Sequence, residues 1–168
     1  MILSPWSGNF DGLIQHFLTM KIRTYHTSDY QAVLAIYAAS KLDELRCEEA
    51  RFELLPLEHD PKRLGQLLES EIYICEEDGI VGYCAKHGAE IRALFVHPES
   101  RGKGFGRCLL EFLLARIPGP ANLYVARSNS PAKNLYMQYG FEVVEEFEIS
   151  YNGTPVIANT MIRPGEKS

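Results

Sequence analysis

The sequence lacks the spacings that would indicate a metal or redox site. No two of its four cysteines, Cys47, Cys75, Cys84 and Cys108, stand in C-x-x-C spacing, and no two histidines stand in H-x-x-x-H spacing. These absences disfavour a structural zinc site and a redox dithiol, and we expect no bound metal. We interpret the cysteines as small core residues and not as a disulfide framework.

An excess of positive charge and long apolar runs are missing as well. Lys and Arg number 17 against 22 Asp and Glu, for a net charge of −5. A protein that binds nucleic acid usually has the opposite sign, so we expect no such partner. No stretch reaches the roughly 20 apolar residues of a membrane span. The first nineteen residues lack the basic start and apolar run of a secretory signal. We therefore expect a cytoplasmic protein with no membrane association.

What is present indicates one folded domain. The chain has 168 residues, of which 46% are hydrophobic, and it shows no internal repeat or low-complexity segment. Residues 1–19 are poorly patterned, and the strand-like run begins just after Met20. We predict an N-terminal extension over 1–19 that lies outside the fold, a domain over 20–164 and a tail over 165–168.

The first half of the domain predicts two helices and four strands. A strand over 21–26 precedes a helix that runs to about residue 45, with Ser28 and Gln31 spaced as a capping box. A shorter helix over 61–70 has Leu64, Leu67 and Leu68 on its apolar face. The next strands, with the turn signal Asp78-Gly79 among them, form an antiparallel meander and cover residues 71–75, 80–86 and 90–96.

The second half changes pattern. A strongly apolar helix over 105–117 lies between the strand at 90–96 and a strand at 122–125. This order predicts a right-handed crossover between two parallel strands. A helix over 131–139 and a final hairpin turning at Asn152-Gly153 complete the chain. The fold class is thus α/β, of the α+β type, with a mixed and mostly antiparallel sheet and a single parallel pair near its middle.

A glycine-rich loop lies between the 90–96 strand and the apolar helix. Gly102, Gly104 and Gly106 alternate with other residues there, and Arg101 and Lys103 add positive charge. Glycines allow a close approach to the backbone, and a helix N-terminus offers free N–H groups, so the loop suits a phosphate or pyrophosphate. The alternative is a turn that merely lets the helix pack against the strand.

Two common phosphate loops do not match. The Walker pattern G-x-x-x-x-G-K-[ST] is absent. The dinucleotide pattern G-x-G-x-x-G would need a glycine where Arg107 stands, and the antiparallel strands before the loop do not fit a doubly wound sheet.

A third loop matches well. The run Arg101-x-x-Gly104-x-Gly106, preceded by Leu94-x-Val96-x-Pro98, resembles the acyl-CoA-binding motif of the GNAT superfamily of N-acetyltransferases. Further on, the series Asn129, Ala132, Tyr136 and Gly140-Phe141 is similar to the second half of that family's core. The order of elements agrees as well, so the resemblance covers about 140 residues, from Lys21 to Ile162.

The resemblance implies a function and a set of binding residues. The activity would be transfer of an acetyl group from acetyl-CoA to a primary amine of a small molecule or peptide, by direct attack in a ternary complex. The parallel strands would splay to admit the pantetheine arm, helices would cover both faces of the sheet, and Asn129 would contact the arm. The further cofactor-binding residues would be Leu94, Phe95 and Val96 on the strand and Arg101, Gly102, Lys103, Gly104, Phe105, Gly106 and Arg107 in the loop.

The reaction also has to move two protons. The attacking amine must lose one, and the departing thiolate must gain one. Tyr136 stands where the family has its general acid. Glu90 has the spacing of a base found in some family members, and the alternative is a solvated residue at the start of a strand. Other members place the base on the next strand, where this chain offers Tyr124 and no carboxylate. A chain of water molecules is the third route for the proton.

The acceptor and the partners are less constrained. An acidic cluster follows the first helix and suggests either a site for a cationic amine or a solvated face; it consists of Asp43, Glu44, Glu48, Glu49 and Glu53. The last strands are a candidate homodimer edge. A competing function keeps the fold as a CoA-binding sensor without turnover.

Overall fold

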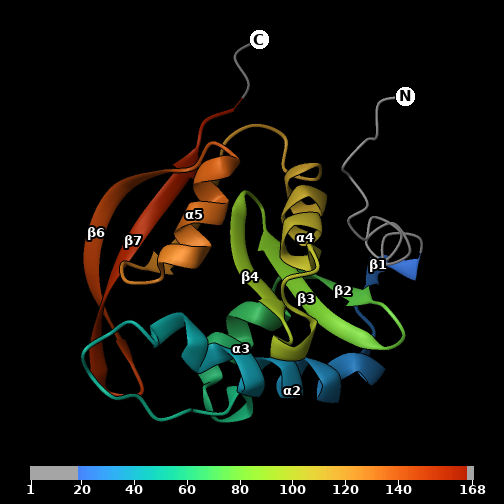
Figure 1. Ribbon diagram of the computed structural model, residues 1–168, viewed down its shortest axis with the longest axis horizontal. Helices are drawn as coiled ribbons and strands as arrows, with labels where there is room; N and C mark the ends of the chain where they lie inside the picture. The colour runs from blue at the N-terminus through green and yellow to red at the C-terminus, as the bar shows by residue number, and fades with distance from the viewer. Residues whose placement is uncertain (1–18, 166–168) are drawn as a thin grey trace, which may run out of the picture.

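Seven strands form one mixed sheet in the order β1-β2-β3-β4-β5-β7-β6 (Figure 1). The computed structural model describes residues 19–165. The strands are β1 (Lys21–Thr24), β2 (Glu71–Glu76), β3 (Ile80–His87), β4 (Glu90–Val96), β5 (Ala121–Ala126), β6 (Glu142–Tyr151) and β7 (Thr154–Arg163). All neighbouring strands of this sheet pair antiparallel except β4 and β5, which confirms the predicted fold class.

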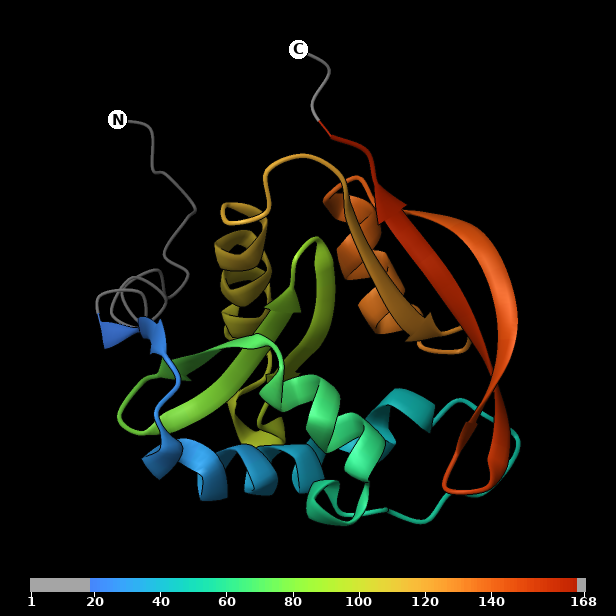
Figure 2. The same cartoon turned by 180° about the vertical axis from the view of Figure 1, so that it is seen from behind.

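Helices cover both faces of the sheet (Figures 1 and 2). Helices α2 (Tyr30–Ser40) and α3 (Pro61–Leu68) lie on one face, and α4 (Phe105–Leu114) and α5 (Ser130–Gln138) lie on the other. Four short 3-10 helices connect them: η1 (Thr27–Asp29), η2 (Lys41–Leu45), η3 (Leu57–His59) and η4 (Pro98–Ser100). Between residues 19 and 165, no helix has both the length and the apolar character needed to cross a membrane.

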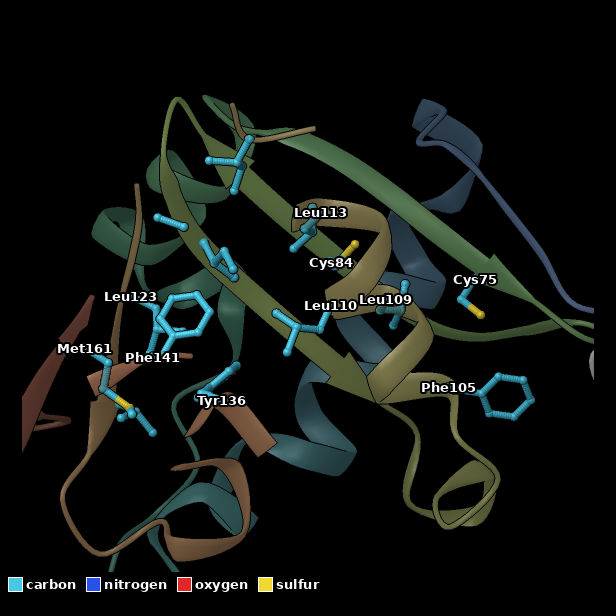
Figure 3. Close-up of a cluster of buried hydrophobic side chains, with 14 of the residues drawn as sticks. Cys75, Cys84, Phe105, Leu109, Leu110, Leu113, Leu123, Tyr136, Phe141 and Met161 are labelled. Carbon is cyan, nitrogen blue, oxygen red and sulfur yellow. The ribbon is translucent and has the colours of Figure 1, made fainter. Parts of the chain in front are cut away.

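Each face of the sheet has its own hydrophobic core. Under α4 and α5, Leu109, Leu110 and Leu113 pack with residues of β2 to β5 and β7 (Figure 3). Under α2 and α3, Ile72 and Ile74 are buried against the helices. Alternate residues of a strand point to opposite faces, so the central strands supply both cores.

The structure corrects the predicted start of the first helix. Ser28 and Gln31 do not form a capping box. Instead, the Asp29 carboxylate accepts the backbone N–H of His26 at 2.8 Å and two N–H groups of Arg23 at 2.7 and 2.9 Å. Arg23 lies on β1, so a contact between elements fixes this turn, and the local spacing could not show it.

Smaller differences concern helix ends and burial. The first helix ends at Ser40 and continues as η2, and α4 ends three residues earlier than predicted, at Leu114. Leu68 is 54% exposed because α3 ends at that residue. Cys47 is exposed in a loop, so it is not a core residue; Cys75 and Cys84 are buried, Cys108 is half-buried, and all four are free thiols.

Two terminal predictions are not settled by the fold. The predicted N-terminal extension lies outside the described residues except for its last position, as does most of the predicted tail. At the sheet edge, β6 carries four exposed glutamates: Glu142, Glu145, Glu146 and Glu148. Like charges on an edge strand oppose pairing with a second copy, and the homodimer stays a prediction.

Candidate functional site

The parallel strands β4 and β5 separate after two residue pairs. Glu90 faces Asn122 and Ile91 faces Leu123, and no further residues of these two strands pair within residues 19–165. Beyond that point β4 still pairs with β3 as far as Val96, so one edge of β4 is bonded and the other is open. The open edge can accept hydrogen bonds from, and donate them to, an extended ligand.

A cavity of about 600 Å³ occupies this gap. Its wall on one side is β4, through Leu94, Phe95 and Val96. The opposite wall comes from β5 and α5, and the remaining walls from η2, the glycine loop and the last hairpin. The volume falls within the range of small-molecule sites.

The glycine loop presents unbonded backbone donors at one end of the cavity. Gly102 and Gly104 have φ values of +76° and +89°, and Gly104 is the N-cap of α4. The first N–H of the helix that donates to its own turn is that of Cys108, to the Gly104 carbonyl at 3.1 Å. The six N–H groups from 102 to 107 have no backbone acceptor among the described residues. This is the geometry that binds a phosphate or pyrophosphate.

Arg101 holds the loop in place. Its Nε donates to the Val96 carbonyl at 3.1 Å, and its Nη1 donates to the Asp43 carboxylate at 2.6 Å. The side chain therefore ties the end of β4 and the start of the loop to η2. Most predicted cofactor residues line the cavity: Leu94, Phe95, Val96, Arg101, Gly102, Gly104, Phe105, Gly106 and Asn129.

Two predicted loop residues do not line the cavity. The side chain of Arg107 turns toward the end of α5, where it donates to Gln138 at 2.6 Å and to the Tyr139 hydroxyl at 3.1 Å. Lys103 is likewise absent from the lining. Their backbone N–H groups remain part of the unbonded set.

Asn129 begins the last helix of the site. Its side-chain oxygen accepts the N–H of Ala132 at 3.3 Å and so caps α5, as the residue type at this position predicts. The side-chain NH₂ group has no hydrogen-bond partner among the described residues, and Asn129 lines the cavity.

Tyr136 lies one turn from the end of α5 and lines the cavity. The residue is 8% exposed, and its ring lies 5.8 Å from the ring of Phe141 (Figure 3). Its hydroxyl makes no hydrogen bond within residues 19–165. Burial raises the pKa of Tyr136 above its usual range, and the nearby charge of Glu44 adds a smaller rise. The phenol is thus protonated at neutral pH, as a proton donor must be.

Glu90 is not brought into the cavity. It lies at the start of β4, about 13 Å before Leu94 at roughly 3.3 Å per residue, and its carboxylate is 3.4 Å from Arg92 Nε. The carboxylates that line the cavity are those of Asp43 and Glu44, both on η2. Tyr124, the other residue weighed for the base, lines the cavity.

The predicted acidic cluster divides in two. Asp43 and Glu44 line the cavity, but each is paired with a cation. Glu48, Glu49 and Glu53 do not line it. The Glu48 carboxylate instead accepts the Ser128 hydroxyl at 2.5 Å. Most of the cluster is therefore loop structure or solvated surface.

Sequence reasoning missed several residues of the cavity wall. They come from segments without a motif and are Lys41, Arg46, Arg63, Ile149 and Tyr151. Two hydrogen bonds join the last hairpin to the segment before α3. The backbone N–H of Leu55 donates to the Tyr151 hydroxyl at 3.0 Å, and the Asn152 side chain donates to the Glu53 carbonyl at 3.2 Å. No local spacing signals contacts across nearly 100 residues.

Comparison with known proteins agrees with this geometry. Residues 69–143 match the family model of the acetyltransferase (GNAT) domain. The peptidyl-lysine N-acetyltransferase YjaB of Salmonella typhimurium is 31% identical over 93 residues, which cover 55% of this chain and 63% of the relative. The peptidyl-lysine N-acetyltransferase YiaC of Escherichia coli is 28% identical over 128 residues, or 74% of this chain and 84% of the relative. The chain thus spans less than two thirds of the first relative.

A solved structure supports the same fold. The GNAT superfamily phosphinothricin acetyltransferase of Sinorhizobium meliloti, solved in complex with acetyl-CoA, superposes with a TM-score of 0.66 at 21% identity. The match covers 89% of this chain and 91% of that protein. The family model over residues 69–143, the curated relatives and the splayed strands beside a glycine loop all support membership of the GNAT superfamily.

Proposed function

We propose that this chain transfers an acetyl group from acetyl-CoA to a primary amine of a small molecule or peptide, by direct attack in a ternary complex. The observation that carries the proposal is the meeting of two backbone features at one cavity. One is the open edge of β4, and the other is the set of six unbonded N–H groups from 102 to 107. Together they fit a ligand with an amide-bearing arm and a pyrophosphate, which is the chemistry of CoA.

The relatives support the activity and suggest one acceptor. YjaB and YiaC are named as peptidyl-lysine N-acetyltransferases, so a lysine side chain of a peptide is one candidate. When bound, acetyl-CoA supplies a thioester whose carbonyl carbon an amine can attack. The nitrogen forms a bond to that carbon, the carbon–sulfur bond breaks, one proton leaves the nitrogen, and one is gained by the sulfur.

This chain's residues would position the donor. The N–H groups of the glycine loop hold the pyrophosphate, and Arg101 keeps the loop against the end of β4. The open edge of β4 and the Asn129 side chain hold the arm. Most of this recognition uses backbone atoms, which explains why the loop is rich in glycine.

Tyr136 would supply the proton for the sulfur. Its raised pKa keeps the hydroxyl protonated, and the same burial would disfavour a bare thiolate beside it, which favours transfer of the proton to the sulfur. For the amine proton, Glu44 is better placed than Glu90. It lines the cavity, and its charge acts on the Tyr136 hydroxyl.

The test compares two hydroxyl deletions on one helix. Tyr136→Phe is expected to lower kcat by about a hundredfold with little change in the Kd of acetyl-CoA. Tyr139→Phe is the matched control. Its hydroxyl donates to Glu111 at 2.5 Å outside the cavity, so kcat should hold. Stopped assays against a panel of amines and calorimetric titration with acetyl-CoA give the two quantities.

Three results would count against the proposal. An unchanged kcat in Tyr136→Phe would remove Tyr136 from the chemistry. Equal losses in both variants would point to a structural effect of α5. Tight binding of acetyl-CoA by the wild-type chain without turnover of any amine would favour the CoA-binding sensor instead.

A further inference from the structure

The cavity carries more positive than negative side chains, although the whole chain has a net charge of −5. The charged residues that line it are Lys41, Asp43, Glu44, Arg46, Arg63 and Arg101. Both anions are already paired: Asp43 lies 2.6 Å from Arg101, and Glu44 lies 2.5 Å from Lys41. Arg46 and Arg63 are not paired with either lining carboxylate, although Arg63 forms an ion pair with Asp60, which does not line the cavity.

These two arginines differ in what they can still bind. Arg46 has no ion-pair or hydrogen-bond partner within residues 19–165, and it follows Leu45, which packs against Tyr151 and Val156 of the last hairpin. Arg63 donates through Nη1 to Asp60 at 2.6 Å. The other two side-chain nitrogens of Arg63 have no partner in the described part of the chain, which leaves donors available.

Two cations lie over the ring of Tyr151, at the end of the cavity beside the last hairpin. Arg63 Cζ lies 4.9 Å from the centre of that ring, and Lys41 Nζ lies 5.5 Å from it. Tyr151 itself is 2% exposed and is held by the N–H of Leu55. A fixed aromatic ring can hold the two cations at defined positions through cation–π contacts.

A buried hydroxyl without a partner lies beside this group. Tyr37 is 3% exposed, and its hydroxyl has no hydrogen-bond partner in the part of the chain that the structure describes. It is close enough to Arg63 and Glu44, which line the cavity, to be affected by their charges. Tyr37 does not line the cavity, so the donors that an acceptor can reach at this end are those of the two arginines.

We propose that Arg46 and Arg63 form a carboxylate subsite for the acceptor. The acceptor would then be an amine with a carboxylate near its amino group, of the amino-acid type. This inference rests on the proposed function and narrows its acceptor. Of the two interpretations of the acidic cluster, it favours the solvated face over a site for a cationic amine, because those acidic residues are paired or outside the cavity.

The first experiment compares matched acceptors. The twenty amino acids, their amides, spermidine and a lysine peptide blocked at both ends are each assayed with acetyl-CoA. For the accepted amino acids, kcat/KM is expected to exceed that of the matching amide by at least about tenfold, because a charge-assisted contact is lost in the amide. Equal rates within pairs, or a preference for spermidine or the blocked lysine peptide, would overturn the subsite.

The second experiment removes one cation. Arg46→Gln is expected to raise KM for the amino acid by about tenfold, with kcat and the rate on the amide unchanged. Arg51→Gln is the control, because Arg51 is an exposed cation of the same segment that does not line the cavity. If Arg46→Gln weakened acetyl-CoA binding and left acceptor preference intact, the cation would serve the donor and the proposal would be wrong.

The subsite can be judged even if the proposed function fails. Absence of acetylation across the panel would count against the function. Calorimetric titration of the amino acids into the CoA complex would then decide the subsite. Binding that Arg46→Gln weakens about tenfold and Arg51→Gln leaves intact would support it, and no binding in wild type would overturn it.

Discussion

At the scale of single residues, the site separates side chains with similar chemistry by where they lie. Glu90 lies on β4 and Glu44 lies on η2. Of these two glutamates, Glu44 lines the cavity and Glu90 does not. Lys41 holds Glu44 through a 2.5 Å contact, while Glu90 lies beside Arg92 at the other end of the strand. A proton acceptor must be within reach of the amine, so position decides between them.

Replacing each glutamate tests this assignment. Glu44→Gln is expected to lower kcat/KM by about a hundredfold near pH 7 and to recover as the pH rises past the pKa of the amine, near 8 for an α-amine. Above that pH the amine is already neutral and needs no base. Glu90→Gln should follow the wild-type profile from pH 6 to 10. A larger loss in Glu90→Gln would restore the original prediction.

Asp29 gives a prediction about stability. Its hydrogen bonds with Arg23 lower the pKa of the Asp29 carboxyl to about 2, against a usual value near 3.9. The folded pKa is depressed, so the stabilisation is present above about pH 4 and is lost as the pH falls toward 2. Asp29→Asn should reduce the free energy of unfolding by about 1–2 kcal/mol at pH 7.

Denaturant titrations at several pH values check this. The loss in Asp29→Asn should shrink between pH 4 and 2, because the wild-type carboxyl is then protonated as well. Glu58→Gln is the control, since Glu58 is exposed and has no ion pair within residues 19–165. A loss that stays constant down to pH 2 would show that packing, not charge, stabilises this turn.

The single residues also show what a sequence can and cannot predict. Tyr136 and Asn129 stand in a motif, and both line the cavity as expected. Arg46 and Arg63 stand in no motif, and the tertiary structure alone places them at the same wall. Glu90 does not line the cavity, and its role as the base stays a prediction, because a spacing of eleven residues before Arg101 gives a position along the strand but not which end of the strand faces the cavity.

At the scale of elements, the glycine loop needs glycine for its backbone conformation and also leaves free space in front of the backbone for a ligand. A Cβ at Gly106 would meet Val96 Cγ2 at 4.0 Å and no other atom nearer, so it would project into the cavity without disturbing the fold. The order of elements and this loop were predictable, because strand and helix patterns and turn glycines are local. The helix start at Asp29 was not, because Arg23 on another element determines it.

Gly106→Ala tests the loop as a binding element. It is expected to weaken acetyl-CoA by at least about tenfold while the free energy of unfolding stays level or rises by up to about 1 kcal/mol, because alanine favours the helix. Gly65→Ala in α3 is the matched control. A Cβ at Gly65 would meet nothing within 4 Å, and Gly65 does not line the cavity. Unchanged acetyl-CoA binding in Gly106→Ala would mean that the loop is merely a turn.

At the scale of the whole molecule, the sheet is weakest in its middle. Two residue pairs join β4 to β5, against six pairs between β5 and β7. The strands on either side are held together chiefly by the core under α4 and α5. A ligand that lies in the gap would therefore contact both halves of the sheet.

This arrangement predicts that acetyl-CoA stabilises the folded chain. At a hundredfold excess over Kd, binding adds about 2.7 kcal/mol, which should raise Tm by about 5 to 10 °C for a chain of this size. Hydrogen exchange should slow at alternate amides of residues 92–96, where β4 has no partner strand on the side toward β5. A rise in Tm without added protection there would place the ligand elsewhere.

The open edge of β4 also bears on how the chain avoids self-association. An unpaired strand edge is a template for other chains, and proteins generally protect such edges with charge or cover them. Here the edge faces inward, across a cavity from β5 and α5. A slender, flexible ligand can reach it, whereas the strand of another protein cannot. The fold thus leaves a sheet edge available for hydrogen bonds with a small molecule while it protects that edge from pairing with another chain.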